Sequence, residues 1–200
     1  GKPLANSWRL TICLVQETSI MPISIIRPRH LLGLVLISLG LTGCDFYATA
    51  PSCLDYFEPG DRSGFITDDN GLAKQTATDT LWYRCAAGQR FSGARCQGDP
   101  TKLAWDDAMA YAQEFAEKSG KAWRIANNEE MLSIQQSACQ SPSVNPNVFK
   151  GIEVNNYWTS SETWSHDSLR CSTYLFQGTM YCRQARNTEL PFLLVLDRDG

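Results

Sequence analysis

Cysteine spacing constrains the fold of this chain more than any other feature. The sequence carries eight cysteines in 200 residues, and six of them follow the pattern C-x31-C-x10-C twice: Cys53, Cys85 and Cys96, then Cys139, Cys171 and Cys182. Such a density is unusual in a reducing compartment, so we expect disulfides and an oxidising compartment. The residues around the two triplets hardly align, and we interpret the repeated spacing as coincidence rather than as a duplication.

Chain reversals reduce the fifteen pairings that six cysteines allow. Gly88 and Gly93 permit a turn within one short cysteine loop, and Gln177-Gly178 is the expected turn of the other. The predicted bridges within these loops are Cys85–Cys96 and Cys171–Cys182. Cys53 and Cys139 are the two cysteines left over, so we expect them to pair. A metal site is disfavoured, because no C-x-x-C occurs and His166 is the only histidine after residue 44.

Composition indicates a globular chain, with 43% hydrophobic and 20% charged residues. The net charge is −3, and residues 45–200 carry 14 Lys+Arg against 20 Asp+Glu, which makes −6. A nucleic-acid binder shows a basic excess, so we exclude that class of partner. The length suits one domain with short appendages.

Residues 21–44 have the layout of an export signal. A short basic region precedes an apolar stretch of about a dozen residues, too short to span a membrane, and the segment ends in Leu41-Thr42-Gly43-Cys44. This ending resembles the lipobox of bacterial lipoproteins, whose cysteine is acylated and becomes the N-terminus. The resemblance implies a lipid on Cys44. The alternative is an ordinary signal peptide whose cysteine is incidental.

A lipid on Cys44 would anchor the chain in the bacterial cell envelope, on the periplasm-facing inner membrane or on the outer membrane. We expect residues 1–20 to be a non-native extension upstream of Met21, and residues 45–61 to form a tether. Residues 62–198 are then left for the folded domain.

Apolar periodicity predicts two helices. The first covers Leu103–Lys118 and stops at Gly120. The second begins near Asn127, which has capping-box spacing to Glu130. The predicted strands are residues 65–66, 81–85, 157–160, 170–176, 179–183 and 190–196. Because strands and helices do not alternate, we expect an α+β fold with an antiparallel sheet.

Several of these segments together resemble one family. Leu81–Cys85 resembles its opening strand, residues 123–131 resemble its WRLP-x-x-x-E-L stretch, and residues 157–161 resemble its YWSSS segment. Over residues 62–198 the chain resembles the Lcl C-terminal domain family, a group of largely unassigned function. Two positions depart from the family pattern, since Ala126 replaces the usual proline and Leu193 stands where the closing arginine often is.

The resemblance implies a C-type-lectin-like fold, with two helices packed on a small twisted antiparallel sheet in which the N- and C-terminal strands meet. The sequence lacks the Glu-Pro-Asn, Gln-Pro-Asp and Trp-Asn-Asp motifs with which C-type lectins bind calcium. We therefore expect neither a metal nor another cofactor. The collagen-like repeats of the adhesin that gives the family its name are also missing, so adhesion does not follow from the resemblance alone.

Catalysis is disfavoured. A serine hydrolase would depend on His166, whose neighbour Asp167 points away from it on an extended segment. No Gly-x-Ser-x-Gly elbow or phosphate loop occurs, and an oxidase would need cysteines that we assign to bridges. We expect a non-catalytic module that binds an envelope glycan or protein, adhesion included. The alternative is a structural subunit of an envelope assembly without a small ligand.

Trp, Tyr and Arg are the usual anchors of binding sites, and they gather in the C-terminal third of the chain. We assign Arg124 to a buried ion pair rather than to a ligand contact. We assign four tryptophans to the core: Trp82, Trp105, Trp123 and Trp158. Since the helix faces are needed for core packing, we expect the ligand to contact the C-terminal loops. The candidate residues are Tyr157, Trp164, His166, Tyr174, Arg183 and Arg186.

The lipobox generates the first prediction. Cys44→Ser removes the acyl acceptor, so the variant should leave the membrane fraction and lose label from a fatty-acid probe. Cell fractionation with such a probe tests this. A variant that stays in the membrane and keeps the label would contradict lipidation at Cys44.

Overall fold

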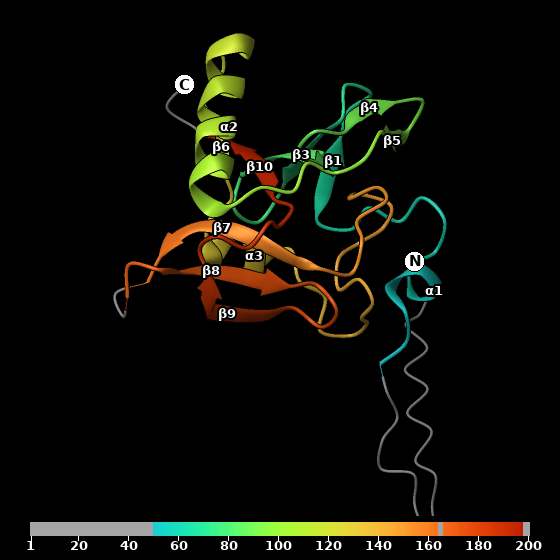
Figure 1. The fold of residues 1–200 in the computed structure, drawn as a ribbon. Coiled ribbons are helices and arrows are strands. Elements are labelled where there is room, and N and C mark those ends of the chain that lie inside the picture. The colour runs from blue at the N-terminus through green and yellow to red at the C-terminus, as the bar shows by residue number, and fades with distance from the viewer. Residues whose placement is uncertain (1–49, 164–165, 198–200) are drawn as a thin grey trace, which may run out of the picture. The chain divides into compact units, whose positions relative to one another are not determined.

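The structure is a computed structural model, and it describes residues 50–163 and 166–197 (Figure 1). The described helices are α1 (Cys53–Tyr56), α2 (Trp105–Ser119) and α3 (Asn128–Ser133). The described strands are β1 (Phe65–Thr67), β2 (Leu72–Gln75), β3 (Leu81–Ala86), β4 (Arg90–Ser92), β5 (Arg95–Gln97), β6 (Trp123–Ile125), β7 (Asn156–Glu162), β8 (Leu169–Tyr174), β9 (Thr179–Ala185) and β10 (Leu193–Leu196). The α+β class with antiparallel pairing is confirmed.

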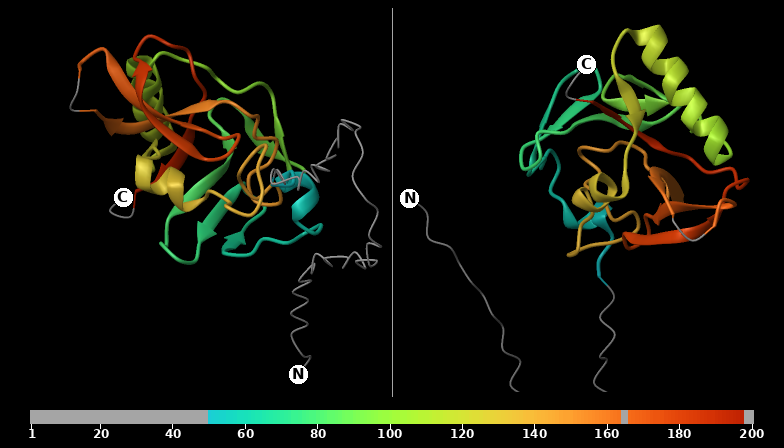
Figure 2. Two further views of the ribbon diagram at one scale, coloured as in Figure 1. Left: turned by 90° about the horizontal axis from the view of Figure 1, so that it is seen from below. Right: turned by 90° about the vertical axis from the view of Figure 1, so that its left-hand side faces the viewer.

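The strands form three separate sheets rather than the one small sheet that we expected. The orders are β1-β2-β3-β10-β6, β4-β5 and β7-β8-β9. Figures 1 and 2 show the orange three-stranded sheet beside the mostly green five-stranded sheet, which it does not continue. The last strand, β10, lies between β3 and β6, so segments from both ends of the domain meet in the larger sheet.

A second sheet is required because strands on both sides of the domain are covered on both faces. Trp82 and Cys85 of β3 point to opposite faces of the strand, and both are fully buried. Tyr157 and Trp158 of β7 are adjacent, and both are also fully buried. A single sheet with one face in solvent cannot bury both faces of β3 and both faces of β7. The two larger sheets therefore enclose two clusters of apolar side chains.

The four tryptophans that we assigned to the core are buried there. Trp82 packs edge-to-face on Phe149, with ring centroids 5.6 Å apart, in the cluster that also contains Tyr157. The other cluster lies under α2 and contains the remaining three, Trp105, Trp123 and Trp158.

Helix α2 agrees with its prediction within two residues. Ala108 and Ala112 are buried on its inner face, and Gly120 ends the helix in the left-handed conformation at φ 64°. The N-terminal end of α2 meets the three-stranded sheet (Figure 1). None of the helices in the described ranges is both long and apolar enough to cross a membrane.

Helix α3 begins as predicted and ends early. Asn127 and Glu130 form the predicted capping box. The helix stops after Ser133, because Gln136 donates its backbone N–H to Ser143 outside the helix. Ala138 therefore lies beyond the end of the helix and is exposed.

The three predicted disulfides, Cys53–Cys139, Cys85–Cys96 and Cys171–Cys182, are present. The first of them changes the expected tether. Cys53 is fully buried, begins α1 (a third helix, which we did not expect) and donates its backbone N–H to Gln140. From Ser52 onward, the segment that we expected as a tether is therefore attached to the domain.

The loop lengths predict unequal contributions of the bridges to stability. Cys53–Cys139 closes 86 residues and Cys85–Cys96 closes 11. Chain entropy predicts a loss of about 4 to 5 kcal/mol for Cys53→Ala/Cys139→Ala and of about 3 kcal/mol for Cys85→Ala/Cys96→Ala. Urea unfolding of both double variants measures the difference. Equal losses, or a larger loss for the short loop, would contradict the entropic account.

Candidate functional site

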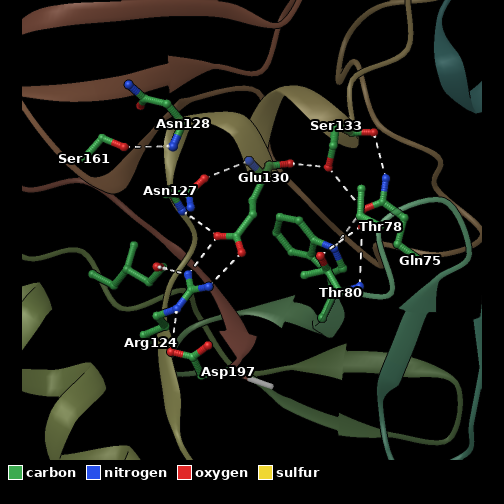
Figure 3. Close-up of polar contacts among 12 residues, drawn as sticks. Gln75, Thr78, Thr80, Arg124, Asn127, Asn128, Glu130, Ser133, Ser161 and Asp197 are labelled. Atoms are coloured by element: carbon green, nitrogen blue, oxygen red, sulfur yellow. Dashed lines mark hydrogen bonds and ion pairs between the residues drawn. The ribbon is translucent and has the colours of Figure 1, made fainter. Parts of the chain in front are cut away.

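The Trp-Arg motif of β6 belongs to a structural network (Figure 3). The two Nη atoms of Arg124 donate to the two carboxylate oxygens of Glu130, each at 2.8 Å. Glu130 Oε2 also accepts the backbone N–H of Asn127, and Arg124 Nε lies 3.4 Å from Asp197 Oδ2. The ion pair that we assigned to Arg124 is therefore confirmed, but it is not fully buried, since the Arg124 side chain is 34% exposed. The hydrogen bond to Glu130 raises the pKa of Arg124 above the ordinary value of an arginine.

The same network continues to the five-stranded sheet. Ser133, the last residue of α3, donates its hydroxyl to Gln75 Oε1 at 3.1 Å, and Gln75 Nε2 donates back to the Ser133 carbonyl at 3.0 Å (Figure 3). Trp82 Nε1 donates to the same Gln75 oxygen. These contacts hold α3 between β2 and β6, so the motif serves the fold.

An open groove of about 700 Å³ lies elsewhere, where the start of α2 meets the ends of the three-stranded sheet. Its walls are residues 104, 106 and 107 at the start of α2, residues 167–169 before and at the start of β8, and residues 185–187 at the end of β9. The backbone N–H of Trp105 donates to the Arg186 carbonyl at 2.9 Å and joins two of these walls.

Trp105 connects the segments that form the walls of the groove. Its indole Nε1 donates to the Thr159 carbonyl of β7 at 2.8 Å, and Trp105 is only 6% exposed. Arg170 and Arg186 place their guanidinium carbons 4.5 and 5.5 Å from the Trp105 ring centroid. Arg170 is buried and also donates to the Asp167 carbonyl at 2.9 Å, which fixes the loop that forms the second wall.

Arg186 links the walls at the surface. It forms an ion pair with Asp106 across the groove and donates Nη1 to the Asp167 carbonyl at 3.3 Å. The hydrogen bond from Arg186 lowers the pKa of Asp106, and the same bond raises the pKa of Arg186. Because the pKa of Asp106 is lowered, the pair is intact at neutral pH and is lost only as the pH falls through that lowered value.

The predicted binding residues divide into three groups. Arg186 lines the groove, and exposed His166 adjoins it through Ser168, whose Oγ is 2.9 Å from His166 Nδ1. Tyr174 and Arg183 are exposed on β8 and β9 but do not line the groove. Trp164 lies outside the described residues.

Tyr157 is wrong as a surface candidate. It is fully buried, its hydroxyl donates to the Glu153 carbonyl at 3.3 Å, and burial raises its pKa. It was chosen as one of the aromatic and arginine residues that gather in the C-terminal third, but its strand is covered on both faces. Sequence reasoning also missed Asp106, Asp107 and Asn187 as groove residues. The two aspartates were visible in the first turn of α2, but nothing in the sequence placed residues 167–169 opposite them.

The groove has the groups of a polar binding site. His166 and Ser168 are exposed, and no carboxylate of the described residues makes a hydrogen bond or ion pair with His166. Within the described ranges, no group of three or more His, Cys, Asp or Glu side chains is placed to hold a metal.

Fold and site together define a disulfide-bonded α+β domain with a polar surface groove. The profile of the Lcl C-terminal domain family matches residues 71–195, so the chain belongs to that family. The match includes Arg124 and Glu130 and both strands of the groove, but not Asp197. No curated protein matches the chain.

The network predicts a specific loss of stability. Glu130→Gln removes the charge that Arg124 faces and should lower the free energy of unfolding by about 2 kcal/mol. Glu129→Gln is the matched control, because Glu129 lies one residue earlier in the same helix turn and is exposed. Urea unfolding of both variants measures the difference, and equal stabilities would contradict the role of the network.

Proposed function

We propose that this protein is a non-catalytic, lipid-anchored glycan-binding module of the bacterial cell envelope. Its ligand occupies the groove between α2 and the three-stranded sheet. The observation that carries the proposal is the convergence of Asp106, Asp107, Arg186 and Asn187 on one open surface.

The chemistry of the groove supports a hydroxyl-rich ligand. Carboxylates accept hydrogen bonds, a guanidinium donates them, and the side-chain amide of Asn187 does both. A sugar ring presents donors and acceptors close together, so mixed polar walls suit it better than one sign of charge would. The ion pair of Arg186 with Asp106 and its bond to the Asp167 carbonyl hold the guanidinium in place before the ligand arrives, which reduces the entropy lost on binding.

The architecture supports the same reading. We propose that the domain is C-type-lectin-like, on the grounds that β10 joins the strands of the N-terminal part in one sheet and that α2 and α3 pack beside it. Recognition would be independent of calcium, since the calcium motifs of C-type lectins are missing from the sequence.

The envelope location rests on the sequence of residues 21–44 and on the disulfides. Cys44 lies outside the described residues, so its lipidation stays a prediction. Three disulfides in one domain fit a compartment outside the reducing cytosol. We propose that the lipid holds the domain at the membrane and that the groove recruits envelope or surface polysaccharide to it.

The test is binding of the full chain, kept in mild detergent, to an array of bacterial envelope and host glycans. Arg186→Ala should weaken the signal on the bound glycans by at least about tenfold, since a central arginine typically carries that much of a binding free energy. Arg95→Ala is the matched control, because Arg95 is an exposed arginine on β5, outside the groove. Thermal unfolding checks that both variants are folded.

Two outcomes would contradict the proposal. If Arg186→Ala and Arg95→Ala lose binding equally, the groove is not the site. If no glycan binds and a protein is instead captured through the groove, the ligand class is wrong although the site is right.

A further inference from the structure

Arg84 on β3 is a buried cation without an ion pair. The residue is 3% exposed, and its Nε, Nη1 and Nη2 donate to the carbonyls of Val148, Asp68 and Asn147 at 2.9, 3.2 and 3.0 Å. No carboxylate of the described residues forms an ion pair with it. Buried charges are ordinarily paired, because desolvation without a counter-charge costs several kcal/mol.

Two further cations increase the positive charge here. Lys150 donates its backbone N–H to the Arg84 carbonyl, and its pKa is lowered by burial and by the charges of Arg84 and Arg62. Burial and the charge of Arg62 likewise lower the pKa of Arg84. Among the described residues, neither Arg62 nor Lys150 has an ion-pair partner. Three cations are therefore held close enough to repel one another.

The nearby carboxylates offset this charge only in part. Asp68 and Asp69 act on Arg84 at a distance and raise its pKa, but less than burial lowers it. The Asp68 carboxylate is already occupied, since it accepts the backbone N–H groups of Asn70 and Leu72 at 3.0 and 2.7 Å.

Two of the three cations, Arg62 and Arg84, border a hollow of about 220 Å³. Thr67, the carboxylates Asp68 and Asp69, and the 93–94 turn also line it, whereas Lys150 does not. Phe91 of β4 lies under Arg84, with the guanidinium carbon 4.6 Å from the ring centroid. Gly71 makes room for that ring, since a Cβ there would lie 2.5 Å from Phe91 Cβ. The guanidinium is thus fixed by three carbonyls and one ring before any ligand binds.

We infer that this hollow is a binding site for a single phosphate group. A guanidinium has five N–H groups, and Arg84 uses three on carbonyls, which leaves one on each Nη for the oxygens of an anion. Arg62 at the rim supplies a second cation. Asp68 and Asp69 also border the hollow and limit its positive charge, and its volume admits one small group rather than an extended polyanion. The inference is independent of the glycan groove.

Titration of the isotope-labelled full chain with inorganic phosphate, followed by NMR at constant ionic strength, tests the site. The backbone amide signals of Thr67, Gly93 and Ala94 should shift and saturate below about 50 mM phosphate, as expected for a millimolar site. Arg62→Gln should weaken binding about fivefold, because it removes one charge-assisted contact. Arg95→Gln, on the neighbouring β5, should change it less than about twofold, since Arg95 does not line the hollow.

Arg84→Met removes the proposed ligand donor but also three hydrogen bonds to carbonyls, so Arg62→Gln keeps the test independent of folding. Parallel titrations with sulfate and acetate separate the anion classes, and sulfate binding as tight as phosphate binding would overturn the assignment to phosphate. Unmoved amides at these three positions, or equal effects of the Arg62 and Arg95 variants, would overturn the site itself.

Discussion

The position of Trp105 is the constraint on which the groove depends. Its indole N–H reaches the Thr159 carbonyl of β7, and its backbone N–H reaches the Arg186 carbonyl beyond β9. One residue therefore joins the start of α2 to both edge strands of the three-stranded sheet, β7 directly and β9 through the residue that follows it. Arg170 and Arg186 both lie against its ring, so the walls of the groove share one aromatic support. The contacts of Trp105 therefore bring the segments that carry Asp106 and Arg186 together, so that the two side chains can form their ion pair.

Local signals in the sequence predicted much of the fold. The cysteine spacing predicted the bridges Cys85–Cys96 and Cys171–Cys182, because short loops with turn residues bring their ends together. Cys53–Cys139 followed because only these two cysteines remained. The capping box at Asn127 and the glycine stop at Gly120 predicted two helix ends, since capping depends on residues only a few positions apart. The Trp-Arg motif, the opening strand and the YWSSS-like segment together predicted the family, and Arg124 was correctly assigned to an ion pair.

Contacts between distant segments were beyond the sequence. We predicted one sheet where there are three, because the burial of both Tyr157 and Trp158 depends on which elements cover β7. For the same reason Tyr157 was taken for a surface residue. The site was predicted in part, since Arg186 and the neighbourhood of His166 were named. Asp106 and Asn187 are 81 residues apart in the chain, and only the Trp105 contacts bring their segments together.

The central claim is that the groove contacts a ligand in the cell envelope. A photo-crosslinking amino acid in place of Asn187, on the groove wall, tests it in living cells, with the same substitution at Arg95 as the control. The account predicts that position 187 is covalently joined to envelope glycan upon irradiation and that position 95 is not. Equal labelling at the two positions, or none at 187 in a folded and anchored protein, would contradict the account.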